Sequence, residues 1–235
     1  MMDDAFEHLQ KSEWTEARRA FESELTAHPK NLEARYNLAL LMAKAGHRER
    51  EKELYIENMQ KGWHLPSVVN LAAIYTAAGD IKAARNLLKK AVKKFRYEAT
   101  PRYLLAELDE KSGNTAGAAD WYEEALKTDP LNGFAHIRYA RFLSAQKRHE
   151  EALKHAERAV ALLPDSASAL AILGDVQVAA GEDDEALASY QKSLAARPDP
   201  RTRQRLIDLL HRNGEHERAN RMQEALDAWL KLQKS

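Results

Sequence analysis

Apolar residues recur along this chain at helical spacing, and the pattern restarts about every 34 residues. In the stretch 121–132, Tyr122, Ala125 and Leu126 occupy positions i, i+3 and i+4 and therefore share one helix face. Asp129-Pro130 follows, and a residue before proline is disfavoured in the α conformation, so a helix is predicted to end there. The same arrangement returns twice, at Ala156, Ala159 and Val160 before Leu163-Pro164, and at Tyr190, Ser193 and Leu194 before Arg197-Pro198.

Isolated glycines mark a second landmark, a turn between two helices. They are Gly46, Gly79, Gly113, Gly181 and Gly214, and Lys147 stands at the one skipped place. Five residues after these turns lie Glu51, Ala84, Ala118, Ala152, Ala186 and Ala219. A small residue at that point lets two helices cross closely. No segment alternates with the period of a half-buried strand, so we predict an all-α chain of helix–turn–helix units.

A longer pattern, N-L-[AG]…Y…G…A…[YF]…A…P, links these landmarks. It is present as NLAAIYTAAGDIKAARNLLKKAV at 70–92 and as AILGDVQVAAGEDDEALASYQKSLAARP at 171–198. This pattern resembles the tetratricopeptide repeat, and the resemblance covers nearly the whole chain. It implies a right-handed α-solenoid of about six to seven antiparallel helix–turn–helix units. It also implies that the first helix of each unit lines the concave face.

The expected organisation is one array over residues 1–235. Its approximate copies are 1–31 (partial), 32–65, 66–98, 99–132, 133–166, 167–199 and 200–235. The early aromatic position of the family is filled by Arg35, Val68, Arg102, His136, Leu170 and Arg203, none of which is aromatic.

Two copies depart from the pattern in ways that predict local structure. In the second copy, Glu51 replaces the small residue, Asn58 replaces a later alanine and Trp63 stands where proline is usual, so looser packing is expected around Glu51 and Trp63. The last helix places Ala219, Met222, Leu226 and Trp229 on one face, which is expected to close the core. Leu230 and Leu232 lie off that face and are expected to be an exposed apolar end.

Composition acts mainly by exclusion. The 36 basic and 36 acidic residues give a net charge of +0, which provides no long-range attraction to nucleic acid or anionic lipid. The absence of cysteine excludes disulfides, thiolate metal sites and cysteine nucleophiles. No apolar run is long enough to span a membrane, and the N-terminus lacks a signal-peptide core. We therefore expect a cytoplasmic protein, or a periplasmic one if a leader is missing. Met1 falls inside the first copy, as expected if upstream sequence is absent.

Candidate catalytic chemistry is sparse. The closest pairs among nine histidines that we considered are His149/His155 and His211/His216, and rings five residues apart on one helix diverge. There is no H-E-x-x-H motif and no glycine-rich phosphate loop. We therefore interpret the histidines as solvated surface residues and expect no metal, no cofactor and no enzymatic activity.

A basic helix face is formed by Lys89, Lys90, Lys93 and Lys94, with Phe95 and Tyr97 beside it. One interpretation is a solvated outer helix whose apolar residues face inward. The other is a contact with nucleic acid. The first is favoured because the net charge is zero and the patch is single, so no nucleic-acid partner is expected.

The expected binding site is the concave groove implied by the resemblance. Aromatic, aliphatic and arginine side chains beside a few hydrogen-bond donors suit a peptide. For Tyr36, Tyr103 and Ile137 the alternative is that they are core between neighbouring helices, and this applies less to Arg138 and Arg141, which are costly to bury unpaired. The groove residues are Tyr36, Asn37, Leu40, Val69, Asn70, Tyr103, Glu107, Phe134, Ile137, Arg138, Arg141 and Asp175, and the last copy adds Gln204, Arg205 and Asp208.

The function expected from these features is that of an adaptor or scaffold without chemistry of its own. It would hold a peptide or helical segment of a partner protein in the groove, in assembly of a larger complex. One alternative is a structural protein that self-associates through its terminal helices. Another is the interaction domain of a longer enzyme or envelope protein.

Overall fold

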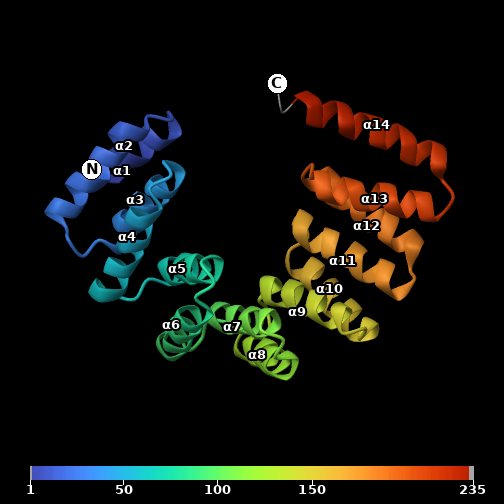
Figure 1. Ribbon diagram of the computed structural model, residues 1–235, viewed down its shortest axis with the longest axis horizontal. Helices are drawn as coiled ribbons and strands as arrows, with labels where there is room; N and C mark the ends of the chain where they lie inside the picture. The colour runs from blue at the N-terminus through green and yellow to red at the C-terminus, as the bar shows by residue number, and fades with distance from the viewer. Residues whose placement is uncertain (1, 233–235) are drawn as a thin grey trace. The chain divides into compact units, whose positions relative to one another are not determined.

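The computed structural model describes residues 2–232, which form fourteen helices and no strand (Figure 1). The all-α prediction is confirmed. The helices are α1 (Met2–Gln10), α2 (Trp14–Ala27), α3 (Leu32–Lys44), α4 (Arg48–Lys61), α5 (Leu65–Ala77), α6 (Ile81–Lys94), α7 (Thr100–Lys111), α8 (Thr115–Thr128), α9 (Gly133–Ala145), α10 (His149–Leu162), α11 (Ala167–Ala180), α12 (Asp183–Ala196), α13 (Pro200–Arg212) and α14 (His216–Leu232).

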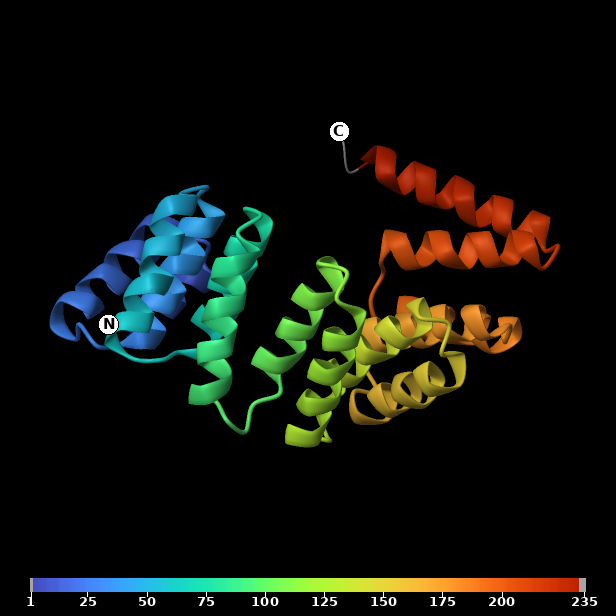
Figure 2. The same ribbon diagram turned by 60° about the horizontal axis from the view of Figure 1, so that its bottom comes forward.

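The chain divides into two compact units, Met1–Trp121 and Tyr122–Ser235, with the boundary inside α8. Within each unit, consecutive helices pack as antiparallel pairs, as α3 and α4 do in the first and α11 and α12 in the second (Figures 1 and 2). First helices of successive pairs also touch, as α9 and α11 do. This packing places residues from first helices side by side, which is what a shared binding surface requires.

The turns inside the pairs take the backbone conformation that the glycines predicted. All five glycines have positive φ, between 75° and 85°. Lys147 takes the same left-handed conformation at the skipped place, with φ 61°, and Ser12 does so in the first pair, with φ 59°. The first copy therefore has the same turn as the others, although its residue is serine. The repeat continues through positions where the sequence lacks its usual glycine.

Alanines five residues after the turns are the contact points within the pairs. Ala84, Ala118, Ala152, Ala186 and Ala219 are all completely buried. Large side chains fill the spaces around them, led by Tyr55, Phe21, Leu88 and Leu105 in the first unit and by Tyr122, Leu143, Leu206 and Leu210 in the second. The helices before Pro130, Pro164 and Pro198 end at residues 128, 162 and 196, as predicted.

The second copy is packed differently from the expectation of a loose junction. Asn58 is completely buried and its polar atoms are bonded: Oδ1 accepts from Arg35 Nη1 at 3.1 Å, and Nδ2 donates to the Leu32 carbonyl at 2.9 Å and to Ser67 Oγ at 2.8 Å. Glu51 is 5% exposed and pairs with Arg48. Glu51 and Asn58 are accommodated because each has a polar partner. The repeat pattern, which has small residues at these positions, did not predict these partners.

The last helix also differs in part. Ala219 and Leu226 are buried and Met222 packs against the core, as expected. Trp229, assigned to the same face, is 41% exposed. Its ring instead borders a small recess of about 40 Å³ with Pro198, Asp199, Pro200 and Arg203. Leu230 and Leu232 are 38% and 74% exposed, so the apolar end of α14 is larger than predicted.

Candidate partner-binding surface

In the first unit, first helices α3 and α5 present a surface that their own side chains hold in place. The Tyr36 ring lies 6.0 Å from the Tyr55 ring and 5.1 Å from the His64 ring, measured between centroids. Asn70 Nδ2 donates to the Tyr55 hydroxyl at 2.8 Å. Leu40, one turn after Tyr36, is 40% exposed. Tyr36 and Asn70 are therefore positioned by Tyr55, and Leu40 supplies an apolar contact that is open to solvent.

The other predicted residues of this unit are less available. The Asn37 amide donates to the carbonyl and the carboxylate of Glu33 in its own helix, at 2.9 and 3.1 Å. Val69 and Glu107 are half-buried. Tyr103 is only 8% exposed, so it belongs to the core rather than to an open groove. This low exposure favours the alternative that was left open for Tyr103, a place in the core between neighbouring helices.

In the second unit, α9 supplies a mixed surface. Phe134 is 56% exposed and Arg141 is exposed, whereas Arg138 is half-buried. Ile137 is 8% exposed and packs with Ala159 and Ala169, so its side chain lies mainly in the core. Burial favours the core alternative for Tyr103 and Ile137, whereas Phe134 and Arg141 are accessible to a partner.

Asp175, together with the predicted Arg205 and Asp208, lines a recess of about 380 Å³ formed by α11, α12 and α13. Asp175 Oδ1 accepts from the Tyr190 hydroxyl at 2.8 Å, and Oδ2 pairs with Arg205 Nη1 at 2.9 Å. Burial raises the pKa of Asp175, and both partners oppose that shift. The recess thus offers charges of both signs beside apolar wall, and its lining is Asp175, Val178, Tyr190, Arg205, Asp208, Leu209 and Arg212.

Gly174 makes this arrangement fit. A Cβ atom at this position would lie 2.6 Å from Cε1 and 2.7 Å from Cδ1 of Tyr190. The glycine therefore leaves room for the Tyr190 ring against α11, and the ring brings its hydroxyl to Asp175. Burial raises the pKa of the Tyr190 hydroxyl, so it remains a hydrogen-bond donor at neutral pH.

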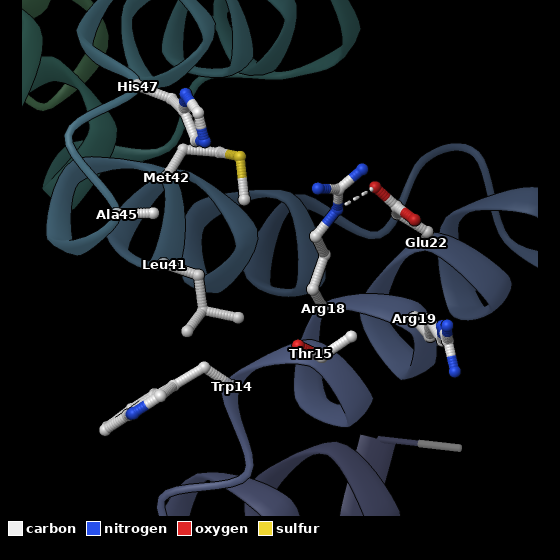
Figure 3. Close-up of a pocket in the computed structure, with 9 residues that line it drawn as sticks. All are labelled: Trp14, Thr15, Arg18, Arg19, Glu22, Leu41, Met42, Ala45 and His47. Atoms are coloured by element: carbon white, nitrogen blue, oxygen red, sulfur yellow. Dashed lines mark hydrogen bonds and ion pairs between the residues drawn. The ribbon is translucent and has the colours of Figure 1, made fainter.

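A second recess, of about 350 Å³, lies between α2 and the end of α3 and was not predicted (Figure 3). Leu41 and Met42 form apolar wall, and Arg18 is held by Glu22 through a bond of 2.8 Å. Lys44 Nζ lies 3.4 Å from the centre of the Trp14 ring, at the rim. The sequence signal was weak because Trp14 and Arg18 belong to the partial first copy. The complete lining is Trp14, Thr15, Arg18, Arg19, Glu22, Leu41, Met42, Ala45 and His47.

Two histidine pairs also differ from expectation. His211 and His216 lie on different helices, and their Nδ1 atoms are 3.3 Å apart, so the prediction that their rings diverge is wrong. His155 does not meet His149 but His136 on α9, with 2.9 Å between the Nδ1 atoms. His136 is 8% exposed, which also corrects its interpretation as a surface residue. In the described range, no three histidine, aspartate or glutamate side chains converge in a way that could hold a metal ion.

No helix between residues 2 and 232 combines the length and the apolar character needed to cross a bilayer.

Comparisons with known proteins agree with the architecture. Three models described as "Tetratricopeptide repeat" match residues 5–47, 75–132 and 133–199. Small glutamine-rich tetratricopeptide repeat-containing protein 2 of Saccharomyces cerevisiae is 33% identical over 85 residues, which are 36% of this chain and 25% of that protein. The match therefore spans a quarter of the relative's length.

Solved structures show the same fold. PilF of Pseudomonas aeruginosa is 25% identical, with a TM-score of 0.63 over 69% of this chain and 74% of that one. A tetratricopeptide repeat protein from Parabacteroides merdae is 15% identical, with a TM-score of 0.69 over 97% of this chain and 91% of that one. With the repeated pairs, the left-handed turns and the buried alanines, these matches show that the chain belongs to the tetratricopeptide-repeat family.

Proposed function

We propose that this protein is an adaptor without chemistry of its own, which binds an extended or helical segment of a partner protein on the exposed faces of its first helices. Family membership supports an interaction scaffold in general terms. The finer proposal is that residues 1–235 act as one array of seven copies and assist assembly of a larger complex. Within each unit, the contact residues we propose are those that remain accessible: Tyr36, Asn37, Leu40, Val69, Asn70 and Glu107 in the first, and Phe134, Arg138, Arg141 and Asp175 in the second.

The observation that carries the proposal is the recess around Asp175. It lies on first helices α11 and α13, and its volume of about 380 Å³ is in the range of sites that hold one or two side chains or a small ligand. Asp208 at its edge is exposed, whereas Asp175 is fixed by Tyr190 and Arg205. Fixed polar groups beside the apolar Val178 and Leu209 favour a peptide that inserts an apolar side chain and is oriented by charge.

The test is affinity capture from an extract of the cells that make the protein. Two baits carry changes on the proposed surface, Phe134→Ser and Asp208→Arg. Two control baits introduce the same new residues at exposed positions elsewhere. They are Leu131→Ser, before α9, and Asp184→Arg, on second helix α12. We expect one partner to be held by wild type and both controls, and to be lost or reduced at least about ten-fold by a surface variant, the effect of roughly 1.4 kcal/mol.

A partner that all baits hold equally would place the interface away from the first helices and contradict the proposal. Circular dichroism of each bait distinguishes loss of contact from loss of fold.

A second candidate function is self-association through α14, favoured by the exposed Trp229, Leu230 and Leu232 at its end. Three neighbouring large apolar side chains on a terminal helix are an interaction surface in many proteins. Sedimentation equilibrium over a range of concentrations tests this directly. A mass that rises with concentration in wild type but not in Leu230→Ser/Leu232→Ser supports self-association, and a constant monomer mass excludes it.

A further inference from the structure

The outer side of α6 carries a row of lysines. Its buried residues Ala84, Leu88 and Ala91 face the core of the first unit. At 100° per residue, Lys82, Lys89 and Lys93 fall within a sector of roughly 40°, directly opposite those core residues. They extend over about 16 Å of helix, and Lys90 and Lys94 lie next to them on one side, roughly 60° and 100° further round the helix. All five are exposed, and together they are called the α6 lysine row below.

These charges are not neutralised locally. Within the described part of the chain, none of the five ammonium groups forms an ion pair or hydrogen bond, and α6 contains no acidic residue. Arginines on other helices behave differently, as in the pairs of Arg18 with Glu22 and Arg148 with Glu151. The lone arginine of α6, Arg85, pairs with Asp109 of α7. The α6 lysine row is therefore a concentrated positive surface in a chain with no net charge.

Overall neutrality does not cancel such a surface. At physiological ionic strength, charges are screened over about 8 Å, which is about half the length of the row. A ligand that touches α6 is therefore attracted by nearby ammonium groups and only weakly repelled by acids elsewhere on the molecule. Zero net charge, which argued against an anionic ligand from the sequence, is therefore no argument against one that contacts α6 directly.

We propose that the α6 lysine row docks the protein on a membrane surface that contains anionic phospholipids. A cylinder meets a plane along one line, and Lys82, Lys89 and Lys93 lie along such a line. Tyr97, three residues beyond the end of α6, is 89% exposed, so an amphipathic ring of the kind found at membrane interfaces is open to solvent near the C-terminal end of the row. Since the apolar side of α6 is buried in the core, binding is electrostatic and peripheral, without insertion.

The composition of the row favours lipid over nucleic acid. Lysine is a hydrated point charge suited to a diffuse anionic surface, whereas phosphate and base recognition uses arginine forks and several stacking aromatics. Here the row has no arginine, and Tyr97 is the one large aromatic strongly exposed near it. The proposal is independent of the adaptor function, because α6 is a second helix and none of its residues is on the proposed first-helix surface.

The experiment is co-sedimentation of the full chain with vesicles of phosphatidylcholine alone and of phosphatidylcholine mixed with phosphatidylserine. One variant replaces Lys82, Lys89, Lys90 and Lys93 with Gln. Its control replaces Lys127, Lys154, Lys192 and Lys231 with Gln, which makes the same change in net charge at exposed positions on other helices. Both keep a good helix former at each site, and circular dichroism verifies the fold.

Wild type and the control are expected to bind only the anionic vesicles, and high salt is expected to release them. Each lysine at the surface contributes about five-fold in partitioning, so the α6 variant is expected to bind at least about 100-fold more weakly. Equal binding by the two variants, or no binding of wild type to anionic vesicles, overturns the proposal. Binding of wild type to a single-stranded oligonucleotide in preference to the vesicles overturns it in favour of a nucleic-acid surface.

Discussion

At the residue scale, three of the four polar side chains at the position that is aromatic in the family are buried. Arg35, Arg102 and His136 are 3%, 7% and 8% exposed. Each donates a hydrogen bond to the carbonyl six residues earlier: Arg35 Nη2 to Pro29 at 2.5 Å, Arg102 Nη2 to Arg96 at 3.0 Å and His136 Nε2 to Pro130 at 3.1 Å. The side chain thus ties the start of a first helix to the loop before it. A buried polar group is tolerated at these sites because it is bonded.

Asn58 is the partner that completes this arrangement in the second copy. Asn58→Ala restores the residue expected from the repeat pattern. We nevertheless expect it to lower the free energy of unfolding by about 2–3 kcal/mol, because the three hydrogen bonds of Asn58 are lost and the buried Arg35 loses one partner. Urea unfolding of the full chain measures this. The control Asn86→Ala removes an exposed amide on α6 and should change stability by less than about 0.5 kcal/mol. A stabilised Asn58→Ala would mean that the network is a burden.

The histidine pair gives a pH dependence. His136 Nε2 donates to Pro130, so its Nδ1 accepts from His155. Burial lowers the pKa of His136, and burial together with His136 lowers the pKa of His155 to about 4. Arg148 also lowers the pKa of His155, whereas Glu151 raises it. Arg158 lowers the pKa of His136, whereas Asp129 raises it.

The unfolded chain takes up these protons near the ordinary pKa of 6.5, whereas the folded chain does so only at lower pH. Stability contributed by the neutral pair is therefore complete above about pH 6.5 and is lost as the pH falls toward 4. His155→Gln should reduce this acid-dependent loss by about 1–2 kcal/mol, after allowance for the partial exposure of the ring. Urea unfolding at pH 7.5 and pH 5 measures it, and His216→Gln, in the more exposed pair, is the control. If His155→Gln loses as much unfolding free energy between pH 7.5 and pH 5 as wild type does, the prediction is contradicted.

At the element scale, the helix ends were predictable and the contacts between helices were only partly so. Proline and glycine act through local backbone preferences, which is why the stops before Pro130, Pro164 and Pro198 and the left-handed turns follow from the sequence. The pairing of His136 with His155 depends on how two antiparallel helices are rotated. The sequence of either helix alone does not determine that rotation. Burial of Tyr103 and Ile137 was left open for the same reason.

The contact between α11 and α12 at Gly174 provides an element-scale prediction. Gly174→Ala improves helix propensity by about 1 kcal/mol, but its Cβ would meet the Tyr190 ring at 2.6 Å. We expect a net loss of about 1–2 kcal/mol, because the ring must move and its bond to Asp175 is weakened.

A double-mutant cycle with Tyr190→Leu tests the cause. In the smaller background Gly174→Ala should cost nothing or stabilise, which gives a coupling of at least about 1 kcal/mol. Equal effects of Gly174→Ala in both backgrounds would show that crowding by Tyr190 is not the reason for the glycine.

At the scale of the whole molecule, the repeat fixes the architecture but leaves the interaction surfaces open. Family identity follows from landmarks that most copies share, such as the buried Ala84 and Ala186. The recess near Trp14 includes side chains of the partial first copy, and the recess near Asp175 depends on which side chains one copy carries around Tyr190, so the repeat landmarks alone do not locate either of them. The charge distribution is likewise not determined by the repeat. The total charge is balanced, but the positions of the charged residues differ from one helix face to another.

The charge distribution can be measured without any ligand. A neutral chain with evenly mixed charges should pass through both cation and anion exchangers at neutral pH and low salt. Because the α6 lysine row is unpaired and exposed, we expect wild type to be retained on the cation exchanger and released by moderate salt, since contacts at the surface are screened within about 10 Å at 0.1 M. The variant with Gln at Lys82, Lys89, Lys90 and Lys93 should elute early from the cation exchanger. The control with Gln at Lys127, Lys154, Lys192 and Lys231 has the same net charge and should still be retained. If the two variants elute together, net charge rather than its position governs the interaction, and the row on α6 is not a distinct surface.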